Sequence, residues 1–140
     1  MINDRYSILE TIGEGRSKVF SCTDKFNPDT RFAIKILSYT ANNDEQDSFN
    51  NEFEMLRKFD HPNIISVFTK GKILSLSDID KSEFSLSEND IFFIMEHIDG
   101  ININKVSEIK RESKFLNILD QLSSVLFYIH QKNNKYIDVK

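Results

Sequence analysis

The chain has 140 residues, of which 39% are hydrophobic and 29% charged, and its formal net charge is −4. This composition is typical of one modest globular domain, and the acidic balance argues against nucleic-acid binding, which requires clustered Lys and Arg. The N-terminus lacks the basic and apolar blocks of a signal peptide, and no apolar run reaches the roughly 20 residues of a membrane span. A single cysteine permits no internal disulfide, so we expect a cytoplasmic protein without nucleic-acid or membrane partners.

The first part of the chain predicts three strands in series. Residues 6–12 and 19–23 are rich in strand-favouring side chains and are separated by a turn that begins at Gly13. A turn cluster at residues 24–29 precedes a third strand over residues 31–37. Short connections of this kind predict an antiparallel meander.

The third predicted strand carries Lys35 among apolar residues, where an ammonium group is costly unless an anion meets it. Two sources of negative charge are available. The turn that contains Gly13 and Gly15 can bring backbone N–H groups against phosphates, and Glu52 lies in a helical pattern that could aim its carboxylate at the strand. The alternative is a lysine that extends to water and a glutamate that faces solvent.

A helix is predicted after residue 44, because large apolar residues recur at helical spacing. They are Phe49, Phe53, Leu56 and Phe59. Asp44 or Asp47 would cap its start, and Pro62 would end it, since the residue before a proline disfavours the α region.

Two further strands are expected over residues 64–68 and 91–95, and the acidic, serine-rich residues 74–90 between them are expected to be an exposed connection. A second, longer helix follows, with an apolar stripe too wide for a surface helix on a small sheet. The stripe consists of Phe115, Ile118, Leu119, Leu122, Val125, Leu126 and Ile129. No metal site is expected from the three histidines, His61, His97 and His130.

Six segments in this order resemble the eukaryotic-type protein kinases, and the resemblance covers the whole chain. The segments are residues 13–19, 32–35, 51–56, 61–65, 93–98 and 128–140. The first is similar to the glycine-rich loop, and Phe32-Ala33-Ile34-Lys35 is similar to the strand motif Val-Ala-Ile-Lys. Glu52 matches the glutamate of the regulatory helix. Each motif alone is weak evidence for this family, but six motifs in the same order and register are strong evidence.

The resemblance implies an α+β fold. Residues 1–98 would form the kinase N-terminal lobe, a five-stranded antiparallel sheet with one main helix. Residues 99–140 would form the hinge and a truncated start of the helical C-terminal lobe. The implied function is transfer of the γ-phosphate of ATP to serine or threonine of a protein substrate, because a lysine two residues after Asp138 resembles the serine/threonine kinases.

The resemblance also assigns residues to roles. Those assigned to nucleotide binding are Ile12, Gly13, Glu14, Gly15, Arg16, Ser17, Lys18, Val19, Ala33, Lys35, Glu52, Met95, Glu96 and Ile98. Lys35 would bind the α- and β-phosphates and be fixed by Glu52. Asp138 would accept or orient the proton of the substrate hydroxyl, and Lys140 would neutralise charge on the γ-phosphate. No metal ligand is assigned, because the Mg²⁺ ligands of the family are expected beyond Lys140.

The chain departs from the family pattern in several places. The glycine loop is one residue short, with Ser17 or Lys18 where a third glycine is usual, so the loop could be stiffer or Lys18 could add a phosphate contact. Tyr136-Ile137-Asp138 replaces His-Arg-Asp, which leaves a phosphorylated activation loop without its arginine partner. The connection at residues 74–90 is longer than usual.

The sequence stops before the catalytic-loop asparagine, the Asp-Phe-Gly motif and the activation segment. We therefore expect these 140 residues alone to bind ATP poorly and to be inactive. The rest of the C-terminal lobe, or a partner protein, would cover the helix at residues 115–129. The alternative is a short pseudokinase-like binding module without catalysis.

Overall fold

The computed structural model of the chain describes residues 1–100 and 112–132. The chain divides into two compact units, residues 1–58 with 66–98 and residues 59–65 with 99–140. The segment 59–65 thus groups with the C-terminal part of the chain. No helix among the described residues is long and apolar enough to span a membrane.

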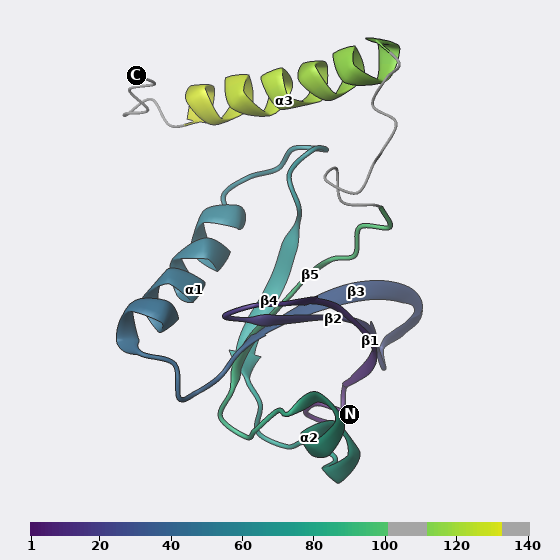
Figure 1. The fold of residues 1–140 in the computed structure, drawn as a ribbon, viewed down its shortest axis with the longest axis vertical. Helices are drawn as coiled ribbons and strands as arrows, with labels where there is room; N and C mark the ends of the chain where they lie inside the picture. The colour runs from purple at the N-terminus through teal and green to yellow at the C-terminus, as the bar shows by residue number, and fades with distance from the viewer. Residues whose placement is uncertain (101–111, 133–140) are drawn as a thin grey trace. The chain divides into compact units, whose positions relative to one another are not determined.

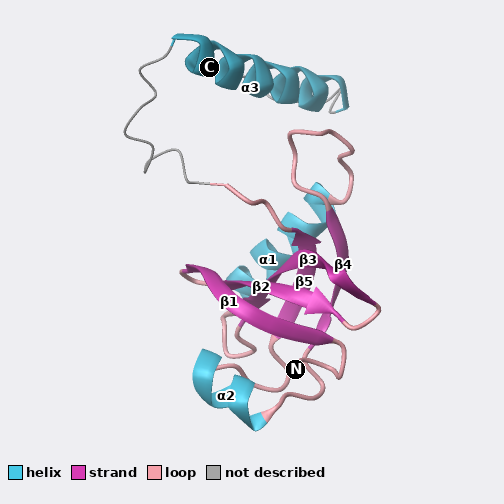
Figure 2. Ribbon diagram, turned by 90° about the vertical axis from the view of Figure 1, so that its right-hand side faces the viewer, coloured by secondary structure: helices cyan, strands magenta, loops and turns pink. Residues whose placement is uncertain are grey.

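The first unit is built on a five-stranded sheet in the order β1-β2-β3-β5-β4. Its strands are β1 (Tyr6–Glu14), β2 (Lys18–Asp24), β3 (Asn27–Leu37), β4 (Val67–Lys72) and β5 (Ile91–Glu96). All neighbouring strands pair antiparallel, which confirms the predicted meander and the α+β class (Figures 1 and 2). Between the strands lie α1 (Asn43–Leu56) and α2 (Asp78–Phe84), and α3 (Glu112–Lys132) belongs to the second unit.

Helix α1 begins at Asn43 and is capped by Asn42, so the predicted cap at Asp44 or Asp47 is wrong. The side chain of Asn42 accepts a hydrogen bond from the backbone N–H of Glu45 (2.9 Å), and the Glu45 carboxylate accepts one from the N–H of Asn42 (3.3 Å). This reciprocal capping box satisfies two N–H groups, which decides the start of the helix. Asp44 instead lies in the first turn, where the helix dipole favours a carboxylate.

The sheet buries apolar side chains on both faces. On the face toward α1, Leu37, Phe49, Phe53 and Phe93 form one cluster, which we call the α1-side core. On the opposite face, which we call the α2 face, a larger cluster forms. Its buried members are Ile2, Tyr6, Phe20, Cys22, Ile34, Ile36, Ile73, Leu76, Leu86, Phe92 and Ile94. Cys22 is a buried core residue, and burial raises the pKa of its thiol to about 12.

The prediction of an exposed connection at residues 74–90 is only partly correct, because most of its residues are exposed but the segment is folded onto the sheet. It contains α2, and it buries Leu76, Leu86 and the carboxylate-bearing side chains of Asp80 and Asp90. The side chain of Ser77 caps α2 by accepting a hydrogen bond from the N–H of Asp80 (3.3 Å). A few apolar residues and buried hydrogen bonds thus fold this polar segment onto the sheet.

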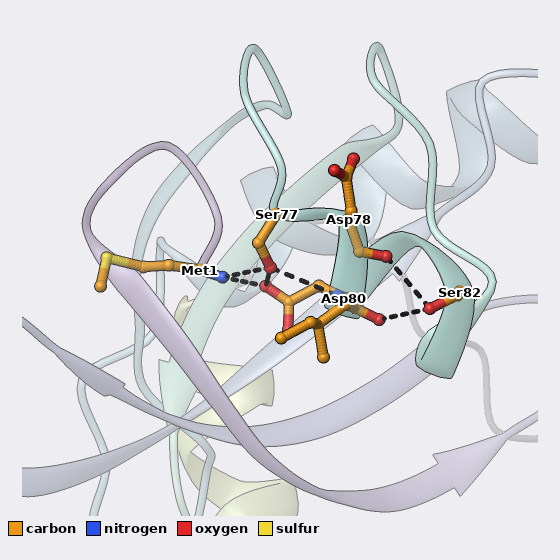
Figure 3. A network of polar contacts seen from close by, with 6 residues as sticks. Met1, Ser77, Asp78, Asp80 and Ser82 are labelled. Carbon is orange, nitrogen blue, oxygen red and sulfur yellow. Dashed lines mark hydrogen bonds and ion pairs between the residues drawn. The ribbon is translucent and has the colours of Figure 1, made fainter.

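The N-terminal residue is tied to the same segment, as Figure 3 shows. The ammonium group of Met1 contacts the carboxylate of Asp80 and the hydroxyl of Ser77, which lies 3.0 Å away. Burial alone would raise the pKa of Asp80, but hydrogen bonds from the terminal ammonium and from Ser77 outweigh it and hold the pKa below its ordinary value.

Strand β4 begins at Val67, three residues later than predicted. Residues 61–65 instead form a turn in which the N–H of Ile64 donates to the carbonyl of His61 (3.0 Å). Gly71 lies beneath the ring of Phe92, where a Cβ atom would come within 3.2 Å of Cζ. A glycine is needed there because of this close approach.

In the second unit, residues 59–65 contact α3. The hydroxyl of Tyr128 accepts a hydrogen bond from the N–H of Asp60 (2.8 Å), and His61 Nε2 lies 3.1 Å from the hydroxyl of Ser124. Phe59, predicted to extend the α1 stripe, lies outside that helix with its ring 6.1 Å from that of Tyr128. Several large apolar side chains of α3 are exposed. They are Phe115, Leu116, Leu119, Leu122, Leu126 and Phe127.

Candidate nucleotide-binding site

The predicted ion pair between Lys35 and Glu52 is confirmed. Lys35 Nζ lies 2.6 Å from both carboxylate oxygens of Glu52, and it also lies 5.7 Å from the centroid of the Phe93 ring. The side chain of Lys35 is only 20% exposed, whereas that of Glu52 is 38% exposed. The pair is therefore partly shielded from water, and the lysine, the more buried partner, has the charge partner that its position requires.

Packing of α1 against β5 positions this pair. The rings of Phe49 and Phe53 lie 4.9 Å and 5.7 Å from that of Phe93, the residue opposite Lys35 in the β3–β5 ladder. Glu52 follows Phe49 by three positions, so both lie on the same side of the helix. Burying the two phenylalanines thus directs Glu52 toward β3.

An open cavity of about 660 Å³ adjoins the ion pair. It lies among the turn of the β1–β2 hairpin, β3 and the first half of α1. The charged side chains in its wall are those of Arg16, Lys35, Asp44, Glu45 and Glu52. Glu52 is bound to Lys35 and Glu45 to its own helix terminus, so two carboxylates have partners already. Arg16, Lys35 and the glycine-containing turn could meet an anion such as a phosphate chain, although the three carboxylates of the wall outnumber these two cations.

The β1–β2 hairpin closes over a three-residue turn, Gly15-Arg16-Ser17, with Glu14 paired to Lys18 and Gly13 paired to Val19. Neither glycine has a positive φ. A Cβ atom on Gly13 would lie 4.0 Å from Val19 Cβ, and one on Gly15 would lie 3.9 Å from the carbonyl oxygen of Ser17. The glycines are therefore not required by strain or by packing within the chain, and they leave the backbone open to close approach by a ligand.

Sheet register brings other predicted nucleotide-binding residues to the same face. Val19 is paired with Lys35, and Ala33 is paired with both Ser21 and Met95. Because paired residues of antiparallel strands share a face, these side chains lie on the side of Lys35. Ala33 is 3% exposed.

The remaining predicted residues of this group lie at strand ends. Ile12 is 50% exposed on β1, and Ile98, after β5, is 64% exposed. Glu96, the last residue of β5, pairs with Phe32, and its N–H donates to the carbonyl of Ser66 (2.8 Å). The resemblance would have Glu96 and Ile98 contact the adenine through backbone groups, and backbone groups have no signature in the sequence.

Of the two possibilities left open for the short glycine loop, a phosphate contact from the Lys18 side chain does not agree with the structure. Lys18 is paired with Ile36, whose side chain belongs to the α2-face cluster, so Lys18 points away from the cavity. Its ammonium group donates to the carbonyl oxygens of Phe84 (2.7 Å) and Ser85 (3.1 Å). Of the two cationic residues Arg16 and Lys18, only Arg16, at the tip of the hairpin, lines the cavity.

Asp138 and Lys140, assigned to catalysis, lie outside the described residues. Sequence reasoning did not include the α1 residues Asp44, Glu45 and Ser48 in the site, although they line the cavity. Their part depends on how α1 docks on the sheet, and spacing along the chain carries no signal of that. Within residues 1–100 and 112–132, no group of three or more His, Cys, Asp or Glu side chains is placed to hold a metal ion.

Comparison with known proteins supports the family assignment. The model of the protein kinase domain matches residues 6–140. The chain is 28% identical over 145 residues to the serine/threonine-protein kinase PrkC of Bacillus subtilis, covering 99% of this chain and 20% of that protein. It is also 28% identical over 144 residues to mouse serine/threonine-protein kinase Nek5, covering 98% of this chain and 20% of the relative. With calcium/calmodulin-dependent protein kinase type 1 of Caenorhabditis elegans, identity is 23% over 99% of this chain and 37% of the relative.

The chain thus spans about a fifth of the length of the first two relatives. The family match nevertheless covers nearly all of the chain, and the sheet, α1 and the Lys35–Glu52 pair agree with the fold that the sequence predicts. The chain belongs to the protein kinase family.

Proposed function

We propose that this chain forms the ATP-binding part of a protein kinase that phosphorylates serine or threonine. The observation that carries the proposal is the Lys35–Glu52 ion pair beside a cavity under a glycine-containing hairpin. An ordinary surface lysine does not need such an arrangement. A lysine that must hold phosphate oxygens does, because a fixed cation need not reorganise when the ligand arrives.

The residues around the cavity fit a phosphate chain. Lys35 would bind the α- and β-phosphates, Arg16 would supply a second cation from the hairpin, and backbone N–H groups of residues 13–17 would approach the phosphate oxygens. Val19 and Ala33 would contact the adenine ring on the same face. Mg²⁺ would neutralise charge on the phosphates, and its protein ligands are expected beyond Lys140.

The reaction would transfer the γ-phosphoryl group. The bond between the γ-phosphorus and the oxygen that leaves with ADP breaks, and a bond to the substrate hydroxyl oxygen forms. Asp138 would take or orient the hydroxyl proton, and Lys140 would neutralise charge on the transferred group. Lys35 acts by positioning, because phosphoryl transfer needs aligned reactants and stabilised charge more than covalent help from the protein.

The exposed apolar residues of α3 favour a covering partner. We propose that the remaining C-terminal lobe covers them, or that a separate protein does so if the chain acts as a binding module. Placement in the reducing cytoplasm is part of the same proposal, on the basis of a lone, buried cysteine.

Transfer of radiolabelled phosphate from ATP to a generic serine/threonine substrate tests the proposed function, with the intact protein and Mg²⁺ present. Lys35→Met should abolish the transfer and leave the fold intact. Asp138→Asn should abolish turnover with less effect on ATP affinity. Unchanged transfer by the Lys35→Met variant would remove the basis of the assignment. ATP binding without any transfer would favour the binding module.

A further inference from the structure

The segment between β4 and β5 contacts the glycine-containing hairpin on the α2 face, away from the cavity. The ammonium group of Lys18 donates hydrogen bonds to the carbonyl oxygens of Phe84 (2.7 Å) and Ser85 (3.1 Å). Phe84 is the last residue of α2, and a helix C-terminus leaves carbonyl groups unpaired and favours a cation. Two residues after Lys18, the ring of Phe20 lies 5.1 Å from that of Phe84, edge to face.

The segment that receives Lys18 is itself fixed on the sheet. Ile73 and Leu86 are 0% and 4% exposed in the α2-face cluster. Asp90, 3% exposed, accepts hydrogen bonds from the backbone N–H groups of Tyr39 and Ser87, both at 2.9 Å. The carbonyl groups that bind Lys18 therefore belong to a segment that buried side chains and hydrogen bonds anchor on the sheet.

Strand β2 presents different residues to the two faces. Val19 is opposite Lys35 on the cavity side, whereas Lys18 and Phe20 point to the α2 face and contact the segment there. The hairpin turn, residues 15–17, directly precedes Lys18, and the pair of Glu14 with Lys18 closes it. Restraining Lys18 therefore restrains the turn above the cavity.

We infer that Lys18 is a positioning residue, which holds the hairpin in place beside the cavity where the phosphate chain of ATP would bind to Lys35. This inference rests on the proposed function. The hairpin has one residue fewer than the glycine-rich loop that the sequence resembles, so it has one backbone N–H group fewer to offer the phosphates. A hairpin already held in place loses less conformational freedom when ATP binds, and affinity rises accordingly.

The test compares Lys18→Met and Lys18→Arg in the intact protein by measuring dissociation constants for ATP and for adenosine, which lacks phosphates. Lys18→Met should weaken ATP binding about tenfold, equivalent to about 1.4 kcal/mol, and should change adenosine binding less than twofold. Lys18→Arg, which can still donate to both carbonyl groups, should restore most of the ATP affinity. Hydrogen exchange of the amides of residues 13–19 should accelerate in Lys18→Met, while that of β3 and β5 stays unchanged.

Lys81→Met is the matched control. Its ammonium group lies in the same segment but is paired with Glu88 at 3.1 Å, so its loss should leave ATP affinity and hairpin exchange as they are. The inference is refuted if Lys18→Met binds ATP like the parent, or if ATP and adenosine weaken equally, as general destabilisation would cause. If Lys35→Met loses ATP binding but Lys18→Met does not, only the role of Lys18 fails. If the parent protein binds no ATP, the proposed function fails and this role fails with it.

Discussion

Glu52 should act on catalysis only through Lys35, and a double-mutant cycle can show this. Glu52 reaches Lys35 Nζ with both carboxylate oxygens at 2.6 Å. The substitution Glu52→Gln keeps the size of the side chain but removes its charge, so Lys35 loses the partner that holds it above Phe93. Lys35→Met removes the ammonium group itself, so Glu52 no longer has a cation to hold in place.

The expected magnitude follows from the exposure of the pair. A fully exposed ion pair is worth at most about 1 kcal/mol, whereas a hydrogen bond to a charged group shielded from water is worth about 1.5–3 kcal/mol. Lys35 is 20% and Glu52 38% exposed, which places the pair between these cases. We expect Glu52→Gln to lower kcat/KM about 10- to 100-fold. This corresponds to a loss of about 1.4–2.8 kcal/mol of transition-state stabilisation.

Because Lys35→Met is expected to abolish steady-state transfer, the assay is single-turnover phosphoryl transfer with the enzyme in excess over ATP, which detects far slower rates. It would compare four forms of the intact protein: the parent, each single variant and the double variant. In the Lys35→Met background, Glu52→Gln should cause no further loss, because both substitutions remove the same interaction. If the two losses simply add, Glu52 has a task apart from Lys35. If Glu52→Gln is as active as the parent, the ion pair has no role in catalysis, and the reasoning is refuted.

Three further predictions concern stability and assembly. Phe53→Ala should lower the free energy of unfolding by about 3–5 kcal/mol in chemical denaturation, because Phe53 is 3% exposed in the α1-side core; an effect below 1 kcal/mol would mean that α1 does not depend on this packing. The hydrogen bonds that Arg5 donates hold the pKa of Asp24 below its ordinary value. The stability that this pair contributes is therefore present above about pH 4 and is lost as the pH falls through the lowered pKa. Asp24→Asn should flatten this part of the curve of unfolding free energy against pH, and an unaltered curve would contradict the role of the pair. The exposed apolar residues of α3 should cause the 140-residue polypeptide to self-associate, because burying each large apolar side chain is worth roughly 1.5–3 kcal/mol. Light scattering would detect the association, and a monodisperse monomer would contradict the need for a covering partner.

The elements that surround the ion pair could be predicted because each has a strong periodic signal. Lys35 is the only residue within positions 32–37 of β3 that is not apolar, and the spacing of Phe49 and Phe53 fixes which side of α1 carries Glu52. The direction of the Lys18 side chain could have been predicted in the same way. Once Val19 is assigned to the cavity face, alternation along the strand sends its neighbour to the other face.

The segment at residues 74–90 could not be predicted, because its fold depends on contacts distant in the sequence. Its few apolar residues become buried only against the N-terminal residues and the α2 face, and Asp90 is satisfied by a backbone N–H group from Tyr39. The composition of residues 74–90 gives no information about these distant contacts. The start of α1 was misplaced for a different reason: Asn42 and Asp44 are equally good caps, and the reciprocal contact with Glu45 decides between them.

The most direct test of the central claim is a structure of the intact protein with Mg²⁺ and a non-hydrolysable ATP analogue. We predict phosphate oxygens within hydrogen-bonding distance of Lys35 Nζ, with the Glu52 carboxylate still bound to that ammonium group and the adenine ring on the face of Val19 and Ala33. A nucleotide bound elsewhere, or a Lys35–Glu52 pair that the bound phosphates do not contact, would contradict the account.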